Sequence, residues 1–318
     1  MEKPDFPLVD WLRDDEDINY DLASSSVEPL TLLDLGELKD DLPLGYPAGS
    51  LKGKVERMVS NTYESDVHLV MTAGAQAANS LIFDTLLEPG DEVLVEDPTY
   101  SPLKVAAEFK GADVKTFKRR YEDSFNINFG RIKEISSEET KMIVFTNPHN
   151  PSGVFQSRDE LEPLVKFSEE NDIYLLIDEI YRVFIEEGAS AVSLSENVIV
   201  TSSLSKIYGL GGLRFGWCAS RNEELIENLK TFKDYLSPSN PTPSLEIASM
   251  AFQNRESLLE RARNVAEKGK NLARGWIKGT SEIEWIEPSQ GIISFPKLDI
   301  EMSSEEFAKE AKRSGVLA

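Results

Sequence analysis

Residues 142–181 read MIVFTNPHNPSGVFQSRDELEPLVKFSEENDIYLLIDEIY, and this stretch places two apolar runs on either side of a helical pattern. The runs Met142–Thr146 and Ile173–Ile177 are continuous rather than alternating, which is typical of strands buried on both faces. The segment between them, Arg158–Asn171, predicts a helix. A strand, a helix and a second strand in this order form the unit from which parallel sheets are built.

The same alternation of apolar runs and helical patterns continues on both sides of this stretch. Five further strands are expected at Val67–Met71, Glu92–Glu96, Val114–Phe117, Val198–Ser202 and Phe215–Ala219. Further helices are expected at Ala75–Leu87, Ser101–Lys110 and Glu223–Phe232. Repeated units of this kind predict the α/β class, and here a large domain with a mostly parallel, seven-stranded sheet flanked by helices.

Beyond Pro243 the pattern changes to that of a smaller α+β unit. We expect one long helical region over Ser244–Lys278, with Gly269 and Gly275 as kinks or breaks. A strand pair and a last helix should follow, at Glu282–Ile286, Ile292–Phe295 and Ser304–Arg313. The first forty-odd residues show no strand–helix pattern and are expected to join this unit. The predicted domains are therefore 45–243 for the large one, and 1–44 with 244–318 for the small one.

Composition excludes several classes of partner. The chain has 318 residues, of which 34 are Lys or Arg and 56 are Asp or Glu, so its formal net charge is −22. Such an acidic protein is repelled by phosphate backbones and anionic lipid surfaces, which argues against nucleic acid and membrane partners. With one cysteine, Cys218, and two histidines, neither an internal disulfide nor a His/Cys zinc site is expected. No apolar run reaches the about 18 residues of a membrane span, so we expect a soluble, cytoplasmic protein without a metal.

Polar residues follow four of the predicted strands. In open parallel sheets ligands gather at the carboxyl ends of the strands, so these residues should share one edge. The segments are Thr72-Ala-Gly-Ala-Gln76, Asn147-Pro-His-Asn-Pro-Ser-Gly153, Asp178-Glu-Ile-Tyr181 and Ser203-Leu-Ser-Lys-Ile-Tyr-Gly-Leu-Gly-Gly-Leu-Arg214. Together they offer small residues for a phosphate at a helix start, an amide, a carboxylate with a phenol, and a lysine with an arginine.

Each of these signals has an ordinary structural explanation when it is taken alone. Gly74 and Ala75 could serve close helix–strand packing, and a lone Lys206 is usually a surface lysine. Asn147, His149 and Asn150 are residues that commonly form turns. Asp178 and Glu179 could be solvated acids at a strand end, and Cys218 could be a core side chain. The order and spacing of all the segments together carry more information than any one of them.

Taken together, the segments resemble a known enzyme family. The motifs Asn150-Pro-Ser-Gly, Asp178-x-x-Tyr181 and Ser203-x-Ser-Lys206, with Arg214 eight residues after the lysine, are similar to those of fold-type I pyridoxal-phosphate enzymes. More narrowly, they resemble the aminotransferases of the aspartate and aromatic amino acid branch. The resemblance runs from about Tyr46 to Phe295 and includes Pro89-Gly-Asp-Glu-Val-Leu-Val and Asp97-Pro-Thr-Tyr100.

The resemblance implies catalytic roles for three residues. Lys206 would form the internal aldimine with pyridoxal 5'-phosphate and, once freed, would carry the proton between the substrate α-carbon and the cofactor. Asp178 would face the pyridine nitrogen and keep it protonated, so that the ring acts as an electron sink. Tyr181 would hydrogen-bond the ring oxygen.

The resemblance also implies the other cofactor contacts. Asn150 would share the ring oxygen with Tyr181, and Tyr100 would stack on the ring face. The phosphate would be held by Gly74, Ala75, Gln76, Ser203 and Arg214. Tyr46 resembles the tyrosine that reaches the phosphate of the neighbouring subunit, which would make the active unit a homodimer.

The implied function is transfer of an amino group between an amino acid and a 2-oxo acid. A carbon–sulfur lyase or an amino acid decarboxylase on the same fold is the alternative, because these enzymes share the cofactor contacts. A cofactor-binding sensor domain of a regulator ranks lower because of the net charge of −22. A structural protein that has lost its cofactor is disfavoured by the presence of both Lys206 and Asp178. The sequence does not identify the donor amino acid.

One departure from the family pattern concerns the C-terminal end. Family members continue past the segment that Ser314–Ala318 resembles, and the continuation carries the arginine that pairs with the substrate α-carboxylate. No arginine after Arg214 matches that place, because Arg313 precedes it. We therefore expect the small domain to be incomplete and the native chain to extend beyond Ala318.

Overall fold

A seven-stranded sheet dominates the fold. The computed structural model describes residues 11, 18–38, 41–184, 190–288 and 291–318. The sheet strands are β2 (His68–Thr72), β3 (Glu92–Asp97), β4 (Asp113–Lys118), β5 (Thr140–Thr146), β6 (Tyr174–Asp178), β7 (Val198–Ser203) and β8 (Gly216–Ser220). All seven predicted strands are thus confirmed to within about two residues at either end.

The sheet is mostly parallel, as predicted. Its strand order is β2-β8-β7-β6-β5-β3-β4, and only β8 runs antiparallel to its neighbours β2 and β7. The other pairs are parallel, so the carboxyl ends of β3, β5, β6 and β7 meet at one edge. The polar segments that follow the predicted strands therefore come together there.

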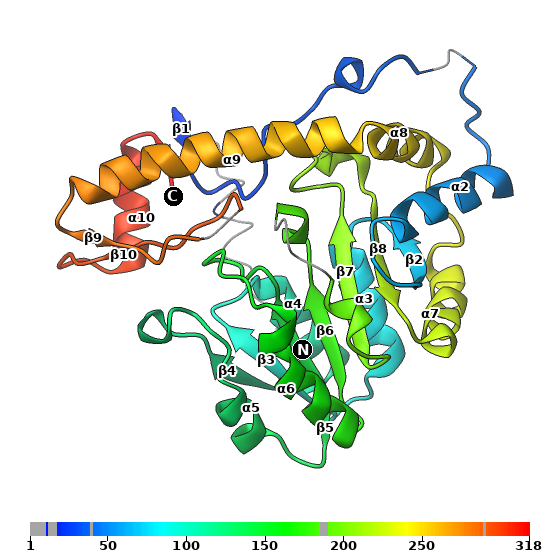
Figure 1. Cartoon of the computed structure of the whole chain (residues 1–318), viewed down its shortest axis with the longest axis horizontal. Coiled ribbons are helices and arrows are strands. Elements are labelled where there is room, and N and C mark those ends of the chain that lie inside the picture. Colours follow the sequence, from blue (N-terminus) through cyan, green and yellow to red (C-terminus); the bar gives the residue numbers. More distant parts are fainter. Residues whose placement is uncertain (1–10, 12–17, 39–40, 185–189, 289–290) are drawn as a thin grey trace.

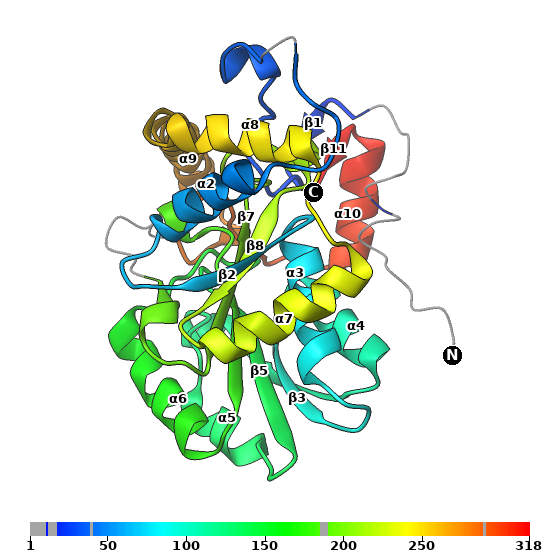
Figure 2. The ribbon, with the colours of Figure 1, turned by 90° about the vertical axis from the view of Figure 1, so that its right-hand side faces the viewer.

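Helices cover both faces of the sheet, which explains why its strands are apolar without alternation. On one face α3 (Ala75–Leu86), α4 (Ser101–Lys110) and α7 (Glu223–Leu236) enclose a core that contains Val93, Val144 and Ile199. On the other face α2 (Gly49–Ser60), α5 (Phe129–Ile135), α6 (Arg158–Glu170) and α8 (Thr242–Gln253) enclose a larger core. In Figure 2, α3 and α4 lie on one side of the strands and α6 on the other.

The long helical region after Pro243 breaks at a different place from the one expected. It consists of α8 and of α9 (Arg255–Lys278), and the break lies at Asn254. The Asn254 amide donates to the carbonyls of Met250 and Leu35, which lets the chain turn between the two helices. Gly269 and Gly275 lie inside α9, where each costs about 1 kcal/mol of helix stability relative to alanine.

The remaining C-terminal elements pair locally. Helix α10 (Ser304–Arg313) matches the prediction, but β9 (Ile283–Glu284) pairs with β10 (Lys297–Leu298), so the expected strand at 292–295 is wrong. Ile292 and Ile293 instead pack against the larger core, and burial of their apolar side chains there replaces pairing in a strand. In Figure 1, α9 runs along the top of the molecule from α8 toward α10, β9 and β10.

The two ends of the described chain meet in a short parallel pair. Strand β1 (Tyr20–Asp21) pairs with β11 (Val316–Leu317). The division into domains 45–243 and 1–44 with 244–318 remains a prediction. Residues 1–10, 12–17, 39–40 and 289–290 of the small domain and 185–189 of the large one lie outside the described residues. In the described part of the chain, no helix has the length and apolar character that crossing a membrane requires.

Candidate active site

A cavity of about 360 Å³ lies at the sheet edge where β3, β5, β6 and β7 end. Its volume falls within the range of small-molecule sites. It is lined by Ser25, Ser26, Ala75, Gln76, Tyr100, Thr146, Asn150, Asp178, Ile180, Tyr181, Ser203, Ser205, Lys206, Gly211 and Arg214. The structure thus brings together all the predicted site residues except Tyr46 and Gly74, and Gly74 lies next to Arg214 at the start of α3.

One end of the cavity is suited to an anion. The helix α3 begins at Ala75 after Gly74, so its free N–H groups and the positive end of its dipole face the cavity. Arg214 stands beside this end, where it donates to the carbonyls of Ala73 at 3.1 Å and Gly211 at 3.0 Å. The Gln76 amide also lines this end: its NH2 group can donate to an anion, whereas its buried Oε1 has no hydrogen-bond partner.

The close approach at this end explains two glycines. Gly74 has a φ of +98°, and a Cβ on it would lie 2.4 Å from the Arg214 guanidinium. A Cβ on Gly216 would lie 2.4 Å from the backbone of Gly74. Any side chain at either position would therefore displace the helix start or the arginine.

A buried carboxylate lies at the end of β6. Asp178 accepts hydrogen bonds from the backbone N–H of Ile180 at 3.1 Å and from the Asn79 amide at 3.4 Å. Burial raises the pKa of Asp178 to about 6, although these two hydrogen bonds and the nearby charge of Lys206 oppose the rise. This carboxylate would be stabilised by a cationic group in the cavity.

The lysine of the site follows β7. Lys206 Nζ donates to Ser25 Oγ at 2.9 Å, and its side chain is partly buried. Burial lowers the pKa of Lys206, the charge of Asp178 opposes this and the charge of Arg214 adds to it. A lysine of lowered pKa is more often neutral, and it can then act as a nucleophile and accept a proton.

Two phenols and an amide complete the walls. Tyr181 donates its hydroxyl to the carbonyl of Ser25 at 3.0 Å, and burial raises its pKa above the ordinary range. Tyr100 stands at the start of α4, and burial together with the charge of Asp178 raises its pKa as well. Asn150 lies in the turn after β5, and its backbone N–H donates to Thr146 Oγ1 at 2.7 Å.

Sequence reasoning missed Ser25 and Ser26. They lie in the irregular N-terminal segment, which reaches the site because Val27 N–H donates to the carbonyl of Lys206 and Leu30 N–H to that of Gly209. No spacing or motif in that segment signals this contact. Tyr46 lies outside the cavity and is 86% exposed. Its predicted contact is with another subunit, so this role stays a prediction.

Comparison with known proteins agrees with this fold. Residues 51–317 match the sequence profile of the family described as "Aminotransferase class I and II". The chain therefore belongs to this family, whose members use pyridoxal phosphate, and the predicted family and cofactor are confirmed.

Individual relatives are similar over different shares of the chain. Capreomycidine synthase of Streptomyces vinaceus is 29% identical over 92% of this chain and 79% of its own length. An aspartate aminotransferase of Sulfurisphaera tokodaii is 31% identical over 58% of this chain, and the match spans about half of that relative, 48%. The crystal structure of a PLP-dependent aminotransferase from Streptococcus suis is 29% identical, with a TM-score of 0.91 over 100% of this chain and 89% of that one.

Proposed function

We propose that the protein transfers an amino group between an amino acid and a 2-oxo acid, with pyridoxal 5'-phosphate held in the strand-end cavity and attached to Lys206 Nζ. The observation that carries this proposal is the convergence on one cavity of Asp178, from the end of β6, with Lys206 and Arg214, from the segment after β7. A lysine, a buried carboxylate and an anion site are the three features that this cofactor chemistry requires.

The charges at the two ends of the cavity fit the cofactor. Arg214 and the start of α3 would hold the phosphate, with Ala75, Gln76 and Ser203 beside them. Asp178 would face the ring nitrogen and keep it protonated, which relieves the cost of burying an unpaired carboxylate. Asn150 and Tyr181 would contact the ring oxygen, and Tyr100 the ring face. When bound, the cofactor supplies an electron sink for the electrons released at the substrate α-carbon.

The protein's own residues then account for the movement of the proton. Burial lowers the pKa of Lys206, so its amine would take the proton from the substrate α-carbon and deliver it to the cofactor. Ser25 Oγ lies 2.9 Å from Nζ and would hold the amine near its place when it is not bonded to the cofactor. Tyr181 would remain neutral, because burial raises its pKa, and its single hydroxyl hydrogen would turn from the Ser25 carbonyl to the ring oxygen when the cofactor is bound.

We further propose that the protein acts as a homodimer in the cytoplasm. The dimer is supported by Tyr46, which is 86% exposed and available to reach the phosphate site of a second copy. The cytoplasm is supported by Cys218, whose free thiol fits a reducing compartment. Sedimentation should then show a dimer. Mixing Tyr46→Ala with Lys206→Ala should restore one site of each hybrid dimer, since that site takes its lysine and its tyrosine from the two different parents. A monomer that retains full turnover would contradict this proposal.

The experiment that tests the function begins with the visible spectrum of protein loaded with pyridoxal phosphate. Borohydride should attach the cofactor irreversibly, and peptide mapping should find it on Lys206. Amino acids should then be screened with a panel of 2-oxo acids. Formation of a new amino acid together with the keto acid of the donor supports the proposal. A label on another lysine, or pyruvate with a thiol or a decarboxylated amine as the only products, would overturn it.

A further inference from the structure

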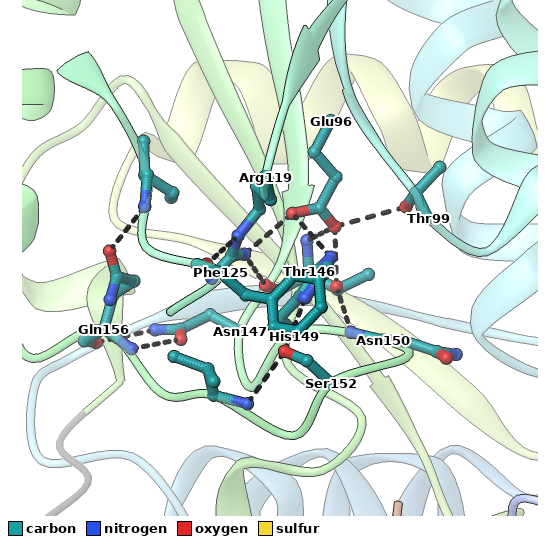
Figure 3. A network of polar contacts seen from close by, with 12 residues as sticks. Glu96, Thr99, Arg119, Phe125, Thr146, Asn147, His149, Asn150, Ser152 and Gln156 are labelled. Atoms are coloured by element: carbon teal, nitrogen blue, oxygen red, sulfur yellow. Dashed lines mark hydrogen bonds and ion pairs between the residues drawn. The ribbon is translucent and has the colours of Figure 1, made fainter. Parts of the chain in front are cut away.

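A buried polar network lies directly behind the wall that carries Asn150 and Tyr100. Figure 3 shows it between the end of β3 and the turn after β5. Its charged members, Glu96 and Arg119, have side chains that are 0% exposed, and Arg119 donates to Glu96 Oε2 at 2.8 Å. A buried ion pair is weak evidence for stability, because apolar residues of the same volume often serve as well. Stability alone therefore does not explain why this ion pair lies beside the candidate site.

Glu96 is the centre of this network. Its Oε1 atom accepts from the backbone N–H of Thr146 at 2.6 Å, from Thr146 Oγ1 at 2.6 Å and from Thr99 Oγ1 at 3.2 Å. With Arg119 on Oε2, four donors converge on one carboxylate, three of them on Oε1. The carboxylate therefore ties the end of β3, just before Tyr100, to the end of β5.

The contact continues from Thr146 to Asn150. The single proton of the Thr146 hydroxyl points to Glu96, so its lone pairs are left to accept the Asn150 N–H at 2.7 Å. The Asn150 side chain extends away from the network (Figure 3) and lines the cavity. The orientation of the Asn150 turn thus depends on a hydroxyl whose direction Glu96 sets.

A neutral histidine makes a second tie between the same two loops. His149 Nε2 lies 2.9 Å from the carbonyl of Pro98, which can only accept, so Nε2 carries the hydrogen and Nδ1 accepts from Ser152. Burial lowers the pKa of His149 to about 4, although the charge of Glu96 opposes the shift. Near neutral pH Arg119 is therefore the cation that balances Glu96 in this network.

From these contacts we propose that Glu96 is a positioning residue, which acts through Thr146 to hold Asn150 against the bound cofactor. The proposal rests on the proposed function, because it assumes that the cofactor ring occupies the cavity beside Asn150. Nothing in the role of Glu96 requires contact with cofactor or substrate.

The test is Glu96→Gln, with Glu92→Gln as the matched control. A glutamine at 96 has the same shape, but its NH2 group must face either the Thr146 N–H or the Arg119 guanidinium, and both are donors. Glu92 lies four residues earlier at the opposite end of β3, is 4% exposed, and is bound by Lys115 and Thr140. Loss of its charge tests the cost of neutralising a buried carboxylate on the same strand, remote from Asn150.

The first measurement is the dissociation constant of pyridoxal phosphate, by equilibrium dialysis against the apoprotein. Glu96→Gln should weaken binding by roughly twofold to tenfold, at most the loss of the one hydrogen bond from Asn150, and Glu92→Gln by less than about twofold. The double variant Glu96→Gln with Asn150→Ala should bind about as Asn150→Ala alone, because both changes remove one contact. Full additivity, or equal effects of the two glutamine variants, would overturn the proposal.

The second measurement is the pH midpoint of the visible absorbance of the loaded protein. The Asn150 amide stabilises the ionised form of the ring oxygen that it would contact, so Glu96→Gln and Asn150→Ala should both raise this midpoint, and Glu92→Gln should not. A merely structural role of Glu96 would leave the midpoint unchanged. If Asn150→Ala itself changes neither affinity nor midpoint, the cofactor assignment under the proposed function fails, and the route from Glu96 through Asn150 fails with it.

A second variant covers the case in which Glu96→Gln does not fold. Thr146→Val removes the hydroxyl between Glu96 and Asn150 and keeps the buried ion pair, whereas Thr146→Ser keeps the hydroxyl. The valine variant should raise the pH midpoint and weaken cofactor binding, and the serine variant should restore both toward the wild type. Equal behaviour of the two would show that the hydroxyl does not carry the effect.

Discussion

The seven-stranded sheet and the C-terminal helices of this molecule are stabilised in different ways. Strands β5, β6, β7 and β8 are buried on both faces, and two cores lie against them. In α9 the buried residues lie near its start, at Leu258, Leu259 and Ala262, and the only buried residue of α10 is Lys312. The sheet therefore holds its strand ends by packing, whereas α9 and α10 depend more on local contacts.

This difference explains why the site lies on the sheet edge. Cofactor chemistry needs groups that stay in place, and side chains at the ends of doubly buried strands inherit the rigidity of the core. The C-terminal helices carry local signals instead, such as the capping box of Ser303 with Glu306 and the ion pair of Lys309 with Glu305. Such contacts define a helix without fixing where it packs.

The largest effect is expected at the site itself. Lys206→Ala should lower turnover by roughly 10³-fold or more, because one amine would serve as anchor and proton carrier. Lys233→Ala is the matched control, since Lys233 also has a pKa lowered by burial but lies in α7 and donates to the carbonyl of Ser237 at the end of that helix. It should keep wild-type turnover. Steady-state kinetics with saturating cofactor decides, and comparable losses in both variants would remove Lys206 from its proposed role.

The next largest effect is expected at the tryptophan of the sheet, Trp217, and Trp276 in α9 is its counterpart below. Trp217 in β8 is 4% exposed and donates to the Tyr63 hydroxyl at 2.7 Å. Trp217→Ala should cost about 3–5 kcal/mol of unfolding free energy, because it opens a cavity and leaves a buried hydroxyl without its partner. Urea denaturation measures this value. A cost below about 1 kcal/mol would show that the sheet is not the stable part of the molecule.

A smaller effect concerns the cost of the site to stability. The pKa of Asp178 rises from 3.8 to about 6 on folding, so its ionised form opposes folding by on the order of 2–3 kcal/mol. The unfolded chain loses this proton near pH 4 and the folded chain near pH 6, so stability falls as pH rises through that window. Asp178→Asn should therefore stabilise the apoprotein at pH 8 and have little effect below pH 4.

The exposed Asp66→Asn is the control for removal of one charge. It should change stability by less than about 0.5 kcal/mol at both pH values. If Asp178→Asn destabilises the apoprotein at pH 8, the carboxylate is stabilised by contacts stronger than those of Ile180 and Asn79.

The smallest effect is expected in the C-terminal region. Trp276 in α9 is 59% exposed, and Trp276→Ala should cost less than about 1 kcal/mol by urea denaturation. Amide exchange should also be faster over the second half of α9 and over α10 than over β5 to β8, because fewer buried contacts must open. Protection of α10 equal to that of the sheet would contradict the contrast between the two regions.

Much of the sheet and the site could be predicted because their signals are local and repeated. Apolar runs such as Met142–Thr146 specify doubly buried strands, and the parallel rule then places Asn150, Asp178 and Lys206 at one edge without any knowledge of contacts. The family motifs implied their roles. Strand positions agree closely with the structure, and so does α10, whose capping box is written in four consecutive residues.

What the sequence determined by itself is therefore the class of fold, the edge that carries the site and the residue types that reach it. Only the tertiary structure decided three further features: the contact of Ser25 with Lys206, the break at Asn254 and the network around Glu96. Each depends on partners that are far apart in the chain, such as Ser25 and Lys206 or Asn254 and Leu35. Periodicity reports which face of an element is apolar, but a contact between distant segments exists only once the cores have packed.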